Sequence, residues 1–380
     1  MIKKIEIEGY RSIDKVCVEL APVTVLIGKS GSGKSNFCHA LCFLRDLTSN
    51  NISNVIKQEG GWTRILPAWG KGSLCRLGIV FSLEDGDDYC YTVCFKPHPN
   101  DPKNMILSEE TMKFGNKTLY SRDTGKWLVP PGMVNPPKLH HDTLAIGILP
   151  AITEVVYAYS ALNTGIGYHN FRSDVLSISK DSKSAAFKGG LDDSAANFRN
   201  VLVELNRDIK LRKSKERIMK CLKAVNDSIQ SIEPDNIQNP DKVIVAHKAG
   251  NLVIDMDLSN ESDGLRRFYA QLLALYQTPS KMILIFEEPE NAIYPAALEI
   301  LAREFNLAAK EGRGQVILTT HNPCLLDYLE SESIRVVDRD GLATKIGMLV
   351  PEQIEALKAK DLFPGELLTV DPARRMAVGE

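Results

Sequence analysis

Residues 23–36, VTVLIGKSGSGKSN, constrain the fold of this chain more than any other segment. The apolar, β-branched run from Val23 to Ile27 predicts a buried strand. It ends in GKSGSGKS, which fits the phosphate-binding pattern GxxxxGK[ST] at every fixed position. The residues from Asn36 to Asp46 then show helical periodicity. A strand, a glycine-rich turn and a helix in this order predict an α/β protein, because a chance turn would lack the two flanking elements.

The positions of this loop have distinct chemical roles. Glycines let backbone N–H groups curve around an anion, and the following helix presents its positive end to the same anion. We expect Lys34 to contact the β- and γ-phosphates of a nucleotide and the Ser35 hydroxyl to bind Mg²⁺. The ligands implied are therefore a nucleotide and Mg²⁺. The predicted phosphate-binding residues are Gly28, Lys29, Ser30, Gly31, Ser32, Gly33, Lys34, Ser35 and Asn36.

A second apolar run, Ile283 to Phe286, ends in two adjacent carboxylates, Glu287 and Glu288. Buried carboxylates are costly unless a cation or a hydrogen-bond donor meets them. In P-loop proteins, a carboxylate at such a strand end helps to hold Mg²⁺. We therefore expect this strand beside the P-loop strand, with Glu287 as a metal ligand and Glu288 as the general base for the attacking water. The alternative is a solvated turn after a strand.

A third apolar run, Val316 to Leu318, is followed by His321. A single histidine is more often structural than catalytic. The position of His321 after a third predicted strand, however, places it at the same edge of the sheet, where it would contact a γ-phosphate. The predicted catalytic residues are Glu288, Glu287, His321 and Lys34.

Together these segments resemble the ABC-type ATPases, and within them the branch that contains the RecF, SMC and OLD-type ATPases. The opening IEIEGYRSIDKVCVEL is similar to the first strand of that branch. GKSGSGKSN is similar to its P-loop, with Ser30 where asparagine is usual. FEEPENAIYP and TTHNPCLLDYL resemble its carboxylate and switch-histidine segments. The resemblance is good over about residues 1–47 and 255–340.

The resemblance also implies a signature segment that opens a helix shortly before the carboxylate strand. Residues 258–276, LSNESDGLRRFYAQLLALY, meet this requirement, with Ser262, Asp263 and Gly264 in place of the usual Ser-Gly-Gly. A serine at a helix start caps the helix. In the family, this segment binds the γ-phosphate held by the other protomer. The resemblance therefore implies a homodimer, or a higher homo-oligomer, that encloses ATP between two subunits.

Two further positions are candidates from the resemblance. Arg11 precedes the P-loop strand, where family members often contact the nucleotide; an ordinary surface residue at a strand end is an equal alternative. Gln58 is the only candidate in the early linker for the glutamine that senses Mg²⁺, and nothing in its surroundings identifies it.

The fold class that the resemblance implies is an α/β ABC-type head, with a mixed central sheet, an antiparallel β-subdomain and a helical lobe. We expect a single head formed from both ends of the chain, about residues 1–130 and 235–380. The helical lobe is inserted at about 143–234. No long heptad run is present, so the long arms of SMC-type proteins are excluded.

Local patterns in the middle of the chain support this outline. Residues 74–83 and 89–95 predict a β-hairpin, and 104–129 predict further strands. Residues 130–142 are rich in proline and predict a loop. Residues 193–232 predict helix, since no proline occurs before Pro234.

Composition narrows the classes of function. The chain of 380 residues is 44% hydrophobic and 25% charged, with a formal net charge of −2, which is typical of a soluble globular protein and indicates neither a nucleic-acid nor a membrane protein. No apolar run approaches the roughly 18–20 residues that span a bilayer, and the N-terminus lacks a signal peptide. The eight cysteines are scattered, which predicts reduced thiols and a cytoplasmic location.

Residues 207–223 carry eight Lys/Arg against two Asp/Glu; they predict either a solvated amphipathic helix or a phosphate-contacting face.

The favoured hypothesis is an ATPase whose ATP-bound dimer gates an action on DNA or on a separate effector protein, for which a nuclease is one candidate. The resemblance to small OLD-like heads implies a role in anti-phage defence or DNA maintenance. About 60 residues follow His321, too few for the nuclease domain of OLD-type proteins, so we expect any nuclease to be a separate polypeptide. The alternatives are the ATP-binding subunit of a membrane transporter, which the FEEPE segment and the missing LSGGQ oppose, and a nucleotide-dependent scaffold with slow turnover.

Overall fold

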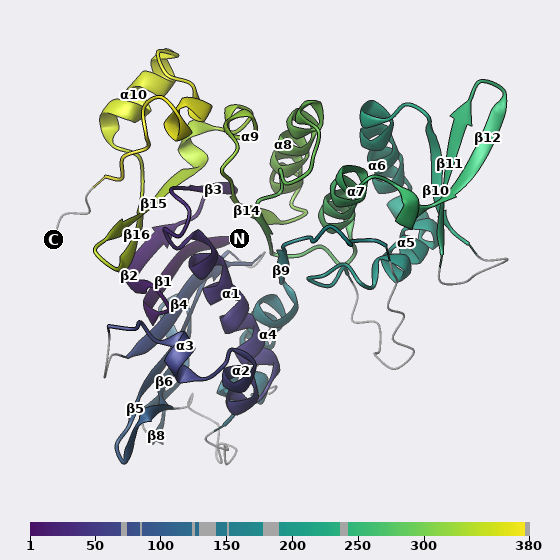
Figure 1. Ribbon diagram of the computed structural model, residues 1–380. Coiled ribbons are helices and arrows are strands. Elements are labelled where there is room, and N and C mark those ends of the chain that lie inside the picture. Colours follow the sequence, from purple (N-terminus) through teal and green to yellow (C-terminus); the bar gives the residue numbers. More distant parts are fainter. Residues whose placement is uncertain are drawn as a thin grey trace. The chain divides into compact units, whose positions relative to one another are not determined.

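The computed structural model describes residues 1–69, 74–83, 86–123, 126–128, 142–149, 152–177, 190–235 and 242–376. The chain divides into two compact units (Figure 1). Unit 1 comprises Met1–Ile166, Ser331–Leu362 and Pro372–Glu380, and unit 2 comprises Gly167–Glu330 and Phe363–Asp371. The expected head with a helical lobe inserted at about 143–234 stays a prediction. The proline-rich loop predicted at 130–142 lies outside the described residues except for its last one.

Unit 1 is built on a mixed sheet. Its strands are β1 (Ile2–Tyr10), β2 (Ile13–Glu19), β3 (Val23–Ile27), β4 (Cys75–Ser82), β5 (Asp88–His98), β6 (Asp101–Phe114), β7 (Lys117–Asp123), β8 (Lys126–Leu128), β15 (Ile334–Asp340) and β16 (Ala343–Gly347). They lie in the order β8-β7-β6-β5-β4-β1-β2-β16-β15-β3. β15 pairs with β3, and β16 with β2, in parallel, whereas β4 to β8 form an antiparallel run. The mixed sheet, the antiparallel β-subdomain and the predicted β4–β5 hairpin are therefore confirmed.

The burial of these strands follows their place in the sheet. All five residues of β3 are buried, as expected for a strand with both faces covered. The helices of unit 1 are α1 (Lys34–Ser49), α2 (Ile52–Gln58), α3 (Trp62–Ile65), α4 (Thr153–Thr164) and α10 (Pro351–Ala359). α1 packs against α2 and α4 and buries Phe37, Leu41 and Leu44 (Figure 1). The P-loop between β3 and α1 therefore joins two well-buried elements.

Unit 2 contains a second set of parallel strands and, among its described residues, five further α-helices. β14 (Gln315–Thr319), β13 (Ile283–Glu287) and β9 (Ile166–His169) lie in that order, and β13 pairs with β14 in parallel. The helices are α5 (Phe198–Arg207), α6 (Arg212–Val225), α7 (Asp263–Tyr276), α8 (Pro295–Lys310) and α9 (Pro323–Asp327). Within the described residues, none of the helices has both the length and the apolar composition that a bilayer-spanning helix needs.

A separate antiparallel sheet completes unit 2. It consists of β10 (Ile229–Pro234), β11 (Val243–Ala249) and β12 (Leu252–Asp257), in that order. The prediction of helix over 193–232 is correct for α5 and α6 and wrong from Ile229 onward. Ile229 and Ile232 of β10 are buried and pair with β11. This pairing depends on β11, a separate strand that begins only at Val243, so the local periodicity of 229–234 does not reveal it.

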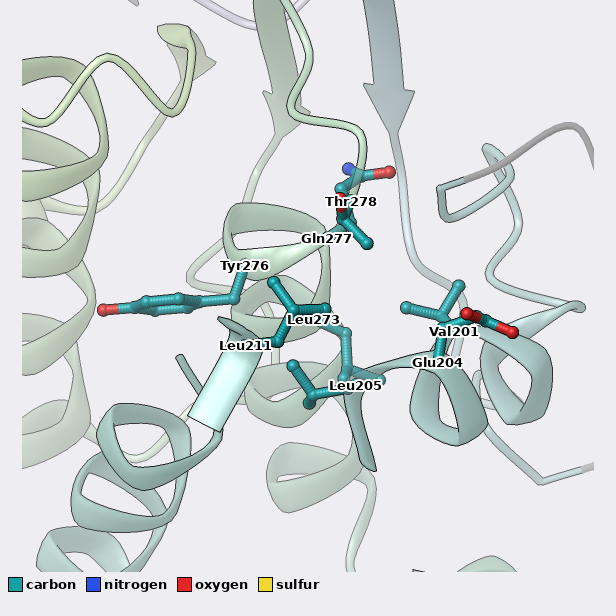
Figure 2. A pocket seen from close by; sticks show the side chains of 8 residues that line it. All are labelled: Val201, Glu204, Leu205, Leu211, Leu273, Tyr276, Gln277 and Thr278. Atoms are coloured by element: carbon teal, nitrogen blue, oxygen red, sulfur yellow. The ribbon is translucent and has the colours of Figure 1, made fainter. Parts of the chain in front are cut away.

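The junction between α5 and α7 is tightly packed. Figure 2 shows a small cavity there, with apolar side chains from both helices around it. Its volume of about 10 Å³ is close to the space that a single water molecule needs. This junction is therefore part of the packing of the helices and not a ligand site. The lining residues are Val201, Glu204, Leu205, Leu211, Leu273, Tyr276, Gln277 and Thr278.

Candidate functional site

The phosphate loop in unit 1 is folded around its own lysine. The Nζ of Lys34 donates to the backbone oxygens of Gly28, at 2.8 Å, and of Lys29, at 3.1 Å. Gly33 caps α1 in a left-handed conformation, and no side chain caps this helix. The first N–H groups of α1 are thus left for another acceptor, and an anion is the acceptor that a helix N-terminus favours. Ser35, in the first turn of α1, is exposed.

A buried hydroxyl pair supports this loop from outside the motif. The Oγ1 of Thr344 donates to the backbone oxygen of Ser32 at 2.8 Å and lies 2.7 Å from the Oγ of Ser12. Asn36 donates from Nδ2 to the same Ser12 oxygen at 2.6 Å. Asn36 was predicted to bind the cofactor, and the structure shows it holding Ser12. Ser12 and Thr344 were missed because Thr344 lies more than 300 residues from Ser12 in the sequence.

Two glycines of the loop are required by close backbone packing. A Cβ at Gly28 would lie 2.0 Å from the backbone oxygen of Val337, and a Cβ at Gly33 would lie 2.1 Å from Thr344 Oγ1. Both have a positive φ, of 150° and 110°. No described atom lies within 4 Å of a Cβ at Gly31, although its φ is 74°. Gly28 and Gly33 therefore let the loop approach β15 and β16 closely.

Arg11 lies in the turn between β1 and β2. It has a φ of 50°, and its Nη2 donates to Glu59 Oε2 at 2.7 Å. The guanidinium is 26% exposed. The predicted contact of Arg11 with the nucleotide stays a prediction, and in this structure its partner is a carboxylate of the loop after α2.

The two predicted carboxylates follow β13 in unit 2 and differ in their surroundings. Glu287 is the last residue of β13 and is buried, while Glu288 is 46% exposed. Asn170 donates from Nδ2 to Glu287 Oε2 at 3.1 Å. Among the described residues, Glu287 Oε1 is buried without a hydrogen-bond partner. A buried carboxylate oxygen left in this way is suited to a cation ligand, since burial without a partner is costly.

Glu288 occupies a strained turn that directs it toward His321. Its φ is 45°, a conformation that non-glycine residues rarely adopt. Its backbone N–H donates to the backbone oxygen and to the Oγ1 of Thr319, both at 3.1 Å. One Glu288 oxygen accepts from Asn291, and the other lies 3.9 Å from His321 Nε2. Strain of this kind is stored at functional sites, and here it holds an exposed carboxylate beside a histidine.

Glu290 was missed by the sequence analysis, although it lies in the quoted FEEPE segment. Its side chain is buried, and Oε1 accepts from the Thr320 hydroxyl at 2.7 Å and from the His321 N–H at 2.9 Å. Among the described residues, Oε2 has no partner. Burial raises the pKa of the Glu290 carboxyl above its ordinary value. Glu290 therefore ties the histidine segment to the carboxylate turn.

The predicted signature forms the start of α7, as expected. Ser262 is the N-cap, and its Oγ accepts from the Leu265 N–H at 3.2 Å. A Cβ at Gly264 would lie 2.4 Å from the backbone oxygen of Ala292, in the turn after the carboxylates. Asp263 accepts from Arg267 within the same helix. Unit 2 thus brings Gly264 to the segment that follows Glu288.

A cavity of about 320 Å³ opens beside this helix start. Ser262 and Gly264 line it on one side, and Ala292 and Tyr294 on the other. Tyr294 is 71% exposed. The signature and the turn after the carboxylates therefore share one surface hollow.

The residues present fit a magnesium nucleotide. No three His, Cys, Asp or Glu side chains gather around a metal position in the described part of the chain. Mg²⁺ is commonly held by one or two carboxylates together with substrate phosphates, so a dedicated protein cage is not needed. In unit 1, the exposed Ser35 hydroxyl is a group that Mg²⁺ can bind. In unit 2, taken by itself, Glu287 Oε1, which has no partner among the described residues, is another. The uncapped α1 terminus and Lys34 would serve the phosphates.

Two family models of ATPase domains match separate parts of the chain. Residues 1–129 match a family model described as "AAA ATPase domain", and residues 156–327 match one described as "AAA domain, putative AbiEii toxin, Type IV TA system". The Old nuclease of Escherichia phage P2 is 21% identical over 393 residues, which cover 94% of this chain and 62% of that protein. The chain thus spans less than two thirds of the length of this relative.

Solved structures show the same fold. An SMC head bound to the C-terminal winged-helix domain of ScpA matches with a TM-score of 0.54 and 16% identity, over 93% of this chain and 99% of that one. An SMC head with an extended coiled coil, bound to the C-terminal domain of ScpA derived from Pyrococcus furiosus, matches with a TM-score of 0.54 and 13% identity, over 95% and 99%. These matches support a P-loop ATPase of the RecF/SMC/OLD-like branch, as the sequence analysis predicted. The SMC head-like fold also confirms the predicted fold class.

Proposed function

We propose that this P-loop ATPase binds and hydrolyses ATP, closes as a dimer around it, and thereby gates an action on DNA or on a separate effector protein. The observation that carries the hydrolysis step is the turn after β13. There a buried carboxylate, Glu287, is followed at once by an exposed one, Glu288, which lies 3.9 Å from a histidine nitrogen. A protein that only bound nucleotide would have no need to hold a carboxylate in a strained turn at such a position.

The proposed roles follow from these contacts. Lys34 and the first N–H groups of α1 bind the phosphates. Ser35 and Glu287 bind Mg²⁺, which supplies charge neutralisation on the phosphate oxygens. Glu288 accepts a proton from the attacking water, because its exposed position lets it reach solvent. His321 contacts the γ-phosphate and is held by Glu290 through its backbone N–H.

The signature acts in the partner subunit's site. Ser262 and Gly264 lie at the N-terminus of α7, where helix geometry favours an anion. The hollow beside them is open to solvent and is not filled by the described residues of the same chain. We therefore propose that a γ-phosphate held by a second copy occupies this hollow in the closed dimer.

The effector is proposed to be a separate protein. The phage relative carries the name of a nuclease, and two similar SMC heads are seen with a domain of ScpA bound. These names support a protein partner and an action on DNA. The proposed role in anti-phage defence or DNA maintenance comes from the resemblance to small OLD-like heads. The basic segment 207–223, most of which lies in α6, is a candidate phosphate-contacting face for that action.

The experiment that tests this proposal uses Glu288→Gln. The variant should lose ATP turnover by roughly 10²–10⁴-fold, because the general base is gone, while it still binds ATP. With ATP and Mg²⁺ its mass in solution should rise to twice the 42.1 kDa chain, because the closed dimer is trapped. Glu311→Gln, at an exposed ion pair with Arg313 at the end of α8, is the matched control and should behave like the wild type.

Two outcomes would contradict the proposal in different parts. Unchanged turnover in Glu288→Gln would show that Glu288 is not the base. A mass of one chain under ATP would show that no closed dimer forms, and would favour a nucleotide-dependent scaffold. Purification of the tagged variant from its own host would then identify a co-eluting effector or nucleic acid, whereas an integral membrane partner would favour a transporter subunit.

A further inference from the structure

The outer strand of the three-stranded sheet in unit 2 exposes an apolar surface. β12 pairs with β11 on one side, and no described strand pairs with its other side, as Figure 1 shows. Leu252, Val253, Ile254 and Met256 are 67%, 61%, 50% and 37% exposed. Single exposed apolar side chains are ordinary, but Leu252, Ile254 and Met256 alternate along the strand and therefore form one apolar patch on one face, while Val253 lies on the other.

This edge lacks most of the devices that keep edge strands from pairing. The sequence LVIDMD contains no lysine, no proline and no bulge, and its register with β11 is unbroken from Ile244↔Asp257 to Ala249↔Leu252. Of its two charges, Asp257 is already engaged by Ser259 and Lys242. The free edge of β12 is therefore suited to the addition of another strand.

The apolar patch also continues the buried face of the sheet. Val245 faces Met256 across the β11–β12 pair and is fully buried, while Ala249 faces Leu252. Residues directly opposite in an antiparallel pair lie on the same face. Leu252, Ile254 and Met256 thus extend the face whose inner part, at β10, packs on α5 and α6.

We propose that β12 pairs in antiparallel fashion with β12 of a second copy of this chain, about a two-fold axis at Ile254. In this register Ile254 faces itself and Leu252 faces Met256 of the other copy, so that six apolar side chains form one stripe. Asp255 of one copy faces Val253 of the other, so the two Asp255 carboxylates are not directly opposite each other. The apolar pattern along this face is therefore self-complementary, and no like charges oppose each other.

Neighbouring registers are less favourable for physical reasons. An axis at Asp255 would place the two Asp255 carboxylates directly opposite each other, which is destabilising. An axis at Val253 would place Met256 opposite Gly250 and leave part of the patch uncovered. The pairing joins two three-stranded sheets and uses no nucleotide, so it is distinct from a dimer that encloses ATP.

The first test is the mass of the purified full chain without nucleotide, measured by light scattering over a range of concentrations. The wild type should approach twice the 42.1 kDa chain as the concentration rises. Ile254→Lys places two like charges opposite each other and should weaken this dimer at least tenfold. Leu342→Lys alters a residue that is 60% exposed in the turn after β15, and should leave the dimer intact. Lys34→Ala should also leave it intact, which separates it from ATP-dependent association.

The second test fixes the register by disulfide trapping. In a background with the exposed Cys17 and Cys324 replaced by serine, Ile254→Cys should form a dimer under mild oxidation. Directly opposed residues have Cα atoms about 4.5–5.5 Å apart, within the range of a disulfide. Val253→Cys faces Asp255 and should not cross-link, whereas the double variant Val253→Cys/Asp255→Cys should.

The proposal is overturned if the wild type stays at one chain without nucleotide at every concentration. It is also overturned if Ile254→Lys dimerises as tightly as the wild type, or if Val253→Cys cross-links as well as Ile254→Cys. Circular dichroism of Ile254→Lys establishes that the loss of mass does not come from unfolding. We expect the variant to fold, because Ile254 is 50% exposed. Equal cross-linking at every position would indicate random collision and would likewise reject the register.

Discussion

The phosphate loop of unit 1 and the carboxylate turn of unit 2 are held in place in different ways. The loop is held partly from within the motif, because Lys34 binds the carbonyls of Gly28 and Lys29, and partly by Thr344, which donates to the backbone oxygen of Ser32. The carboxylate turn instead depends on partners far away in the sequence, such as Asn170 at Glu287. The loop is shaped mainly by backbone geometry, whereas the turn is shaped by side-chain hydrogen bonds. Changes in the two regions should therefore affect different steps.

The largest effect is expected from Gly28→Ala, which breaks the loop. Its Cβ would meet the Val337 oxygen at 2.0 Å, and the backbone of two buried strands cannot readily move apart. We expect ATP affinity to fall by about 100-fold or more, because displacement of the loop by about 1 Å misaligns every phosphate contact. Titration with a fluorescent ATP analogue measures this.

Gly31→Ala is the matched control for that experiment. No described atom lies within 4 Å of its Cβ, so only the positive φ opposes the substitution, at a cost of about 1–2 kcal/mol. Equal losses of affinity in the two variants would show that close packing on β15 is not what the loop requires.

The next largest effect is expected from Glu290, which acts on the turn and not on the loop. Glu290→Leu removes the acceptor for Thr320 and for the His321 N–H. We expect kcat to fall by roughly 10–100-fold while the Kd for ATP stays unchanged, because a supporting residue, not a binding one, is lost. Turnover and nucleotide titration together measure this split.

Glu290→Gln distinguishes positioning from general stability. Its side-chain oxygen can still accept both hydrogen bonds, so we expect most of kcat to return. If Glu290→Gln is as inactive as Glu290→Leu although both variants are folded, the turn requires the negative charge of Glu290 and not only a hydrogen-bond acceptor.

A smaller effect is expected at Asn170. Asn170→Ala removes the donor to Glu287 Oε2, and the carboxylate is then held less firmly. We expect the Mg²⁺ concentration for half-maximal turnover to rise by about tenfold, as for other residues that support a metal ligand. Asn54→Ala, at an exposed position on α2, should leave this concentration unchanged. An unchanged Mg²⁺ requirement in Asn170→Ala would show that Asn170 does not support Mg²⁺ binding.

The smallest effect on activity is expected from Glu304, a buried carboxylate of unit 2. Its hydrogen-bond partners belong to neither the phosphate loop nor the carboxylate turn. It is 0% exposed and accepts from Arg217 and from the Tyr276 hydroxyl. Burial alone would raise its pKa, but the hydrogen bonds from Arg217 and Tyr276 outweigh burial, and the pKa is lowered. The contrast with Glu290, whose pKa is raised, shows what a cationic partner does to a buried acid.

The contribution of Glu304 to the free energy of unfolding depends on pH. Because the folded pKa of Glu304 lies below the unfolded one, its stabilisation is present above the unfolded pKa and is lost as the pH falls through the folded pKa. Glu304→Gln should therefore lose less unfolding free energy on acidification than the wild type, by about 1–2 kcal/mol. Urea unfolding at several acidic pH values measures this. An identical pH profile in both proteins would reject the assignment.

Much of the fold could be predicted from local patterns. The strand before the P-loop, the helix after it, the β4–β5 hairpin and the capped start of α7 all depend on periodicity or on a motif of a few residues. β10 could not be predicted in this way, because its segment becomes a strand only by pairing with β11. Local sequence carries the information where the stabilising contacts are themselves local.

The candidate site divides along the same line. The sequence by itself determined the phosphate loop, the two carboxylates after β13 and the histidine after β14, since each follows a recognisable strand. Only the tertiary structure decided which groups support them: Ser12 and Thr344 behind the loop, and Asn170 beside Glu287. The physical reason is range. A backbone turn is set by its own few dihedral angles, whereas a hydrogen bond between residues more than 100 positions apart exists only once the chain has folded.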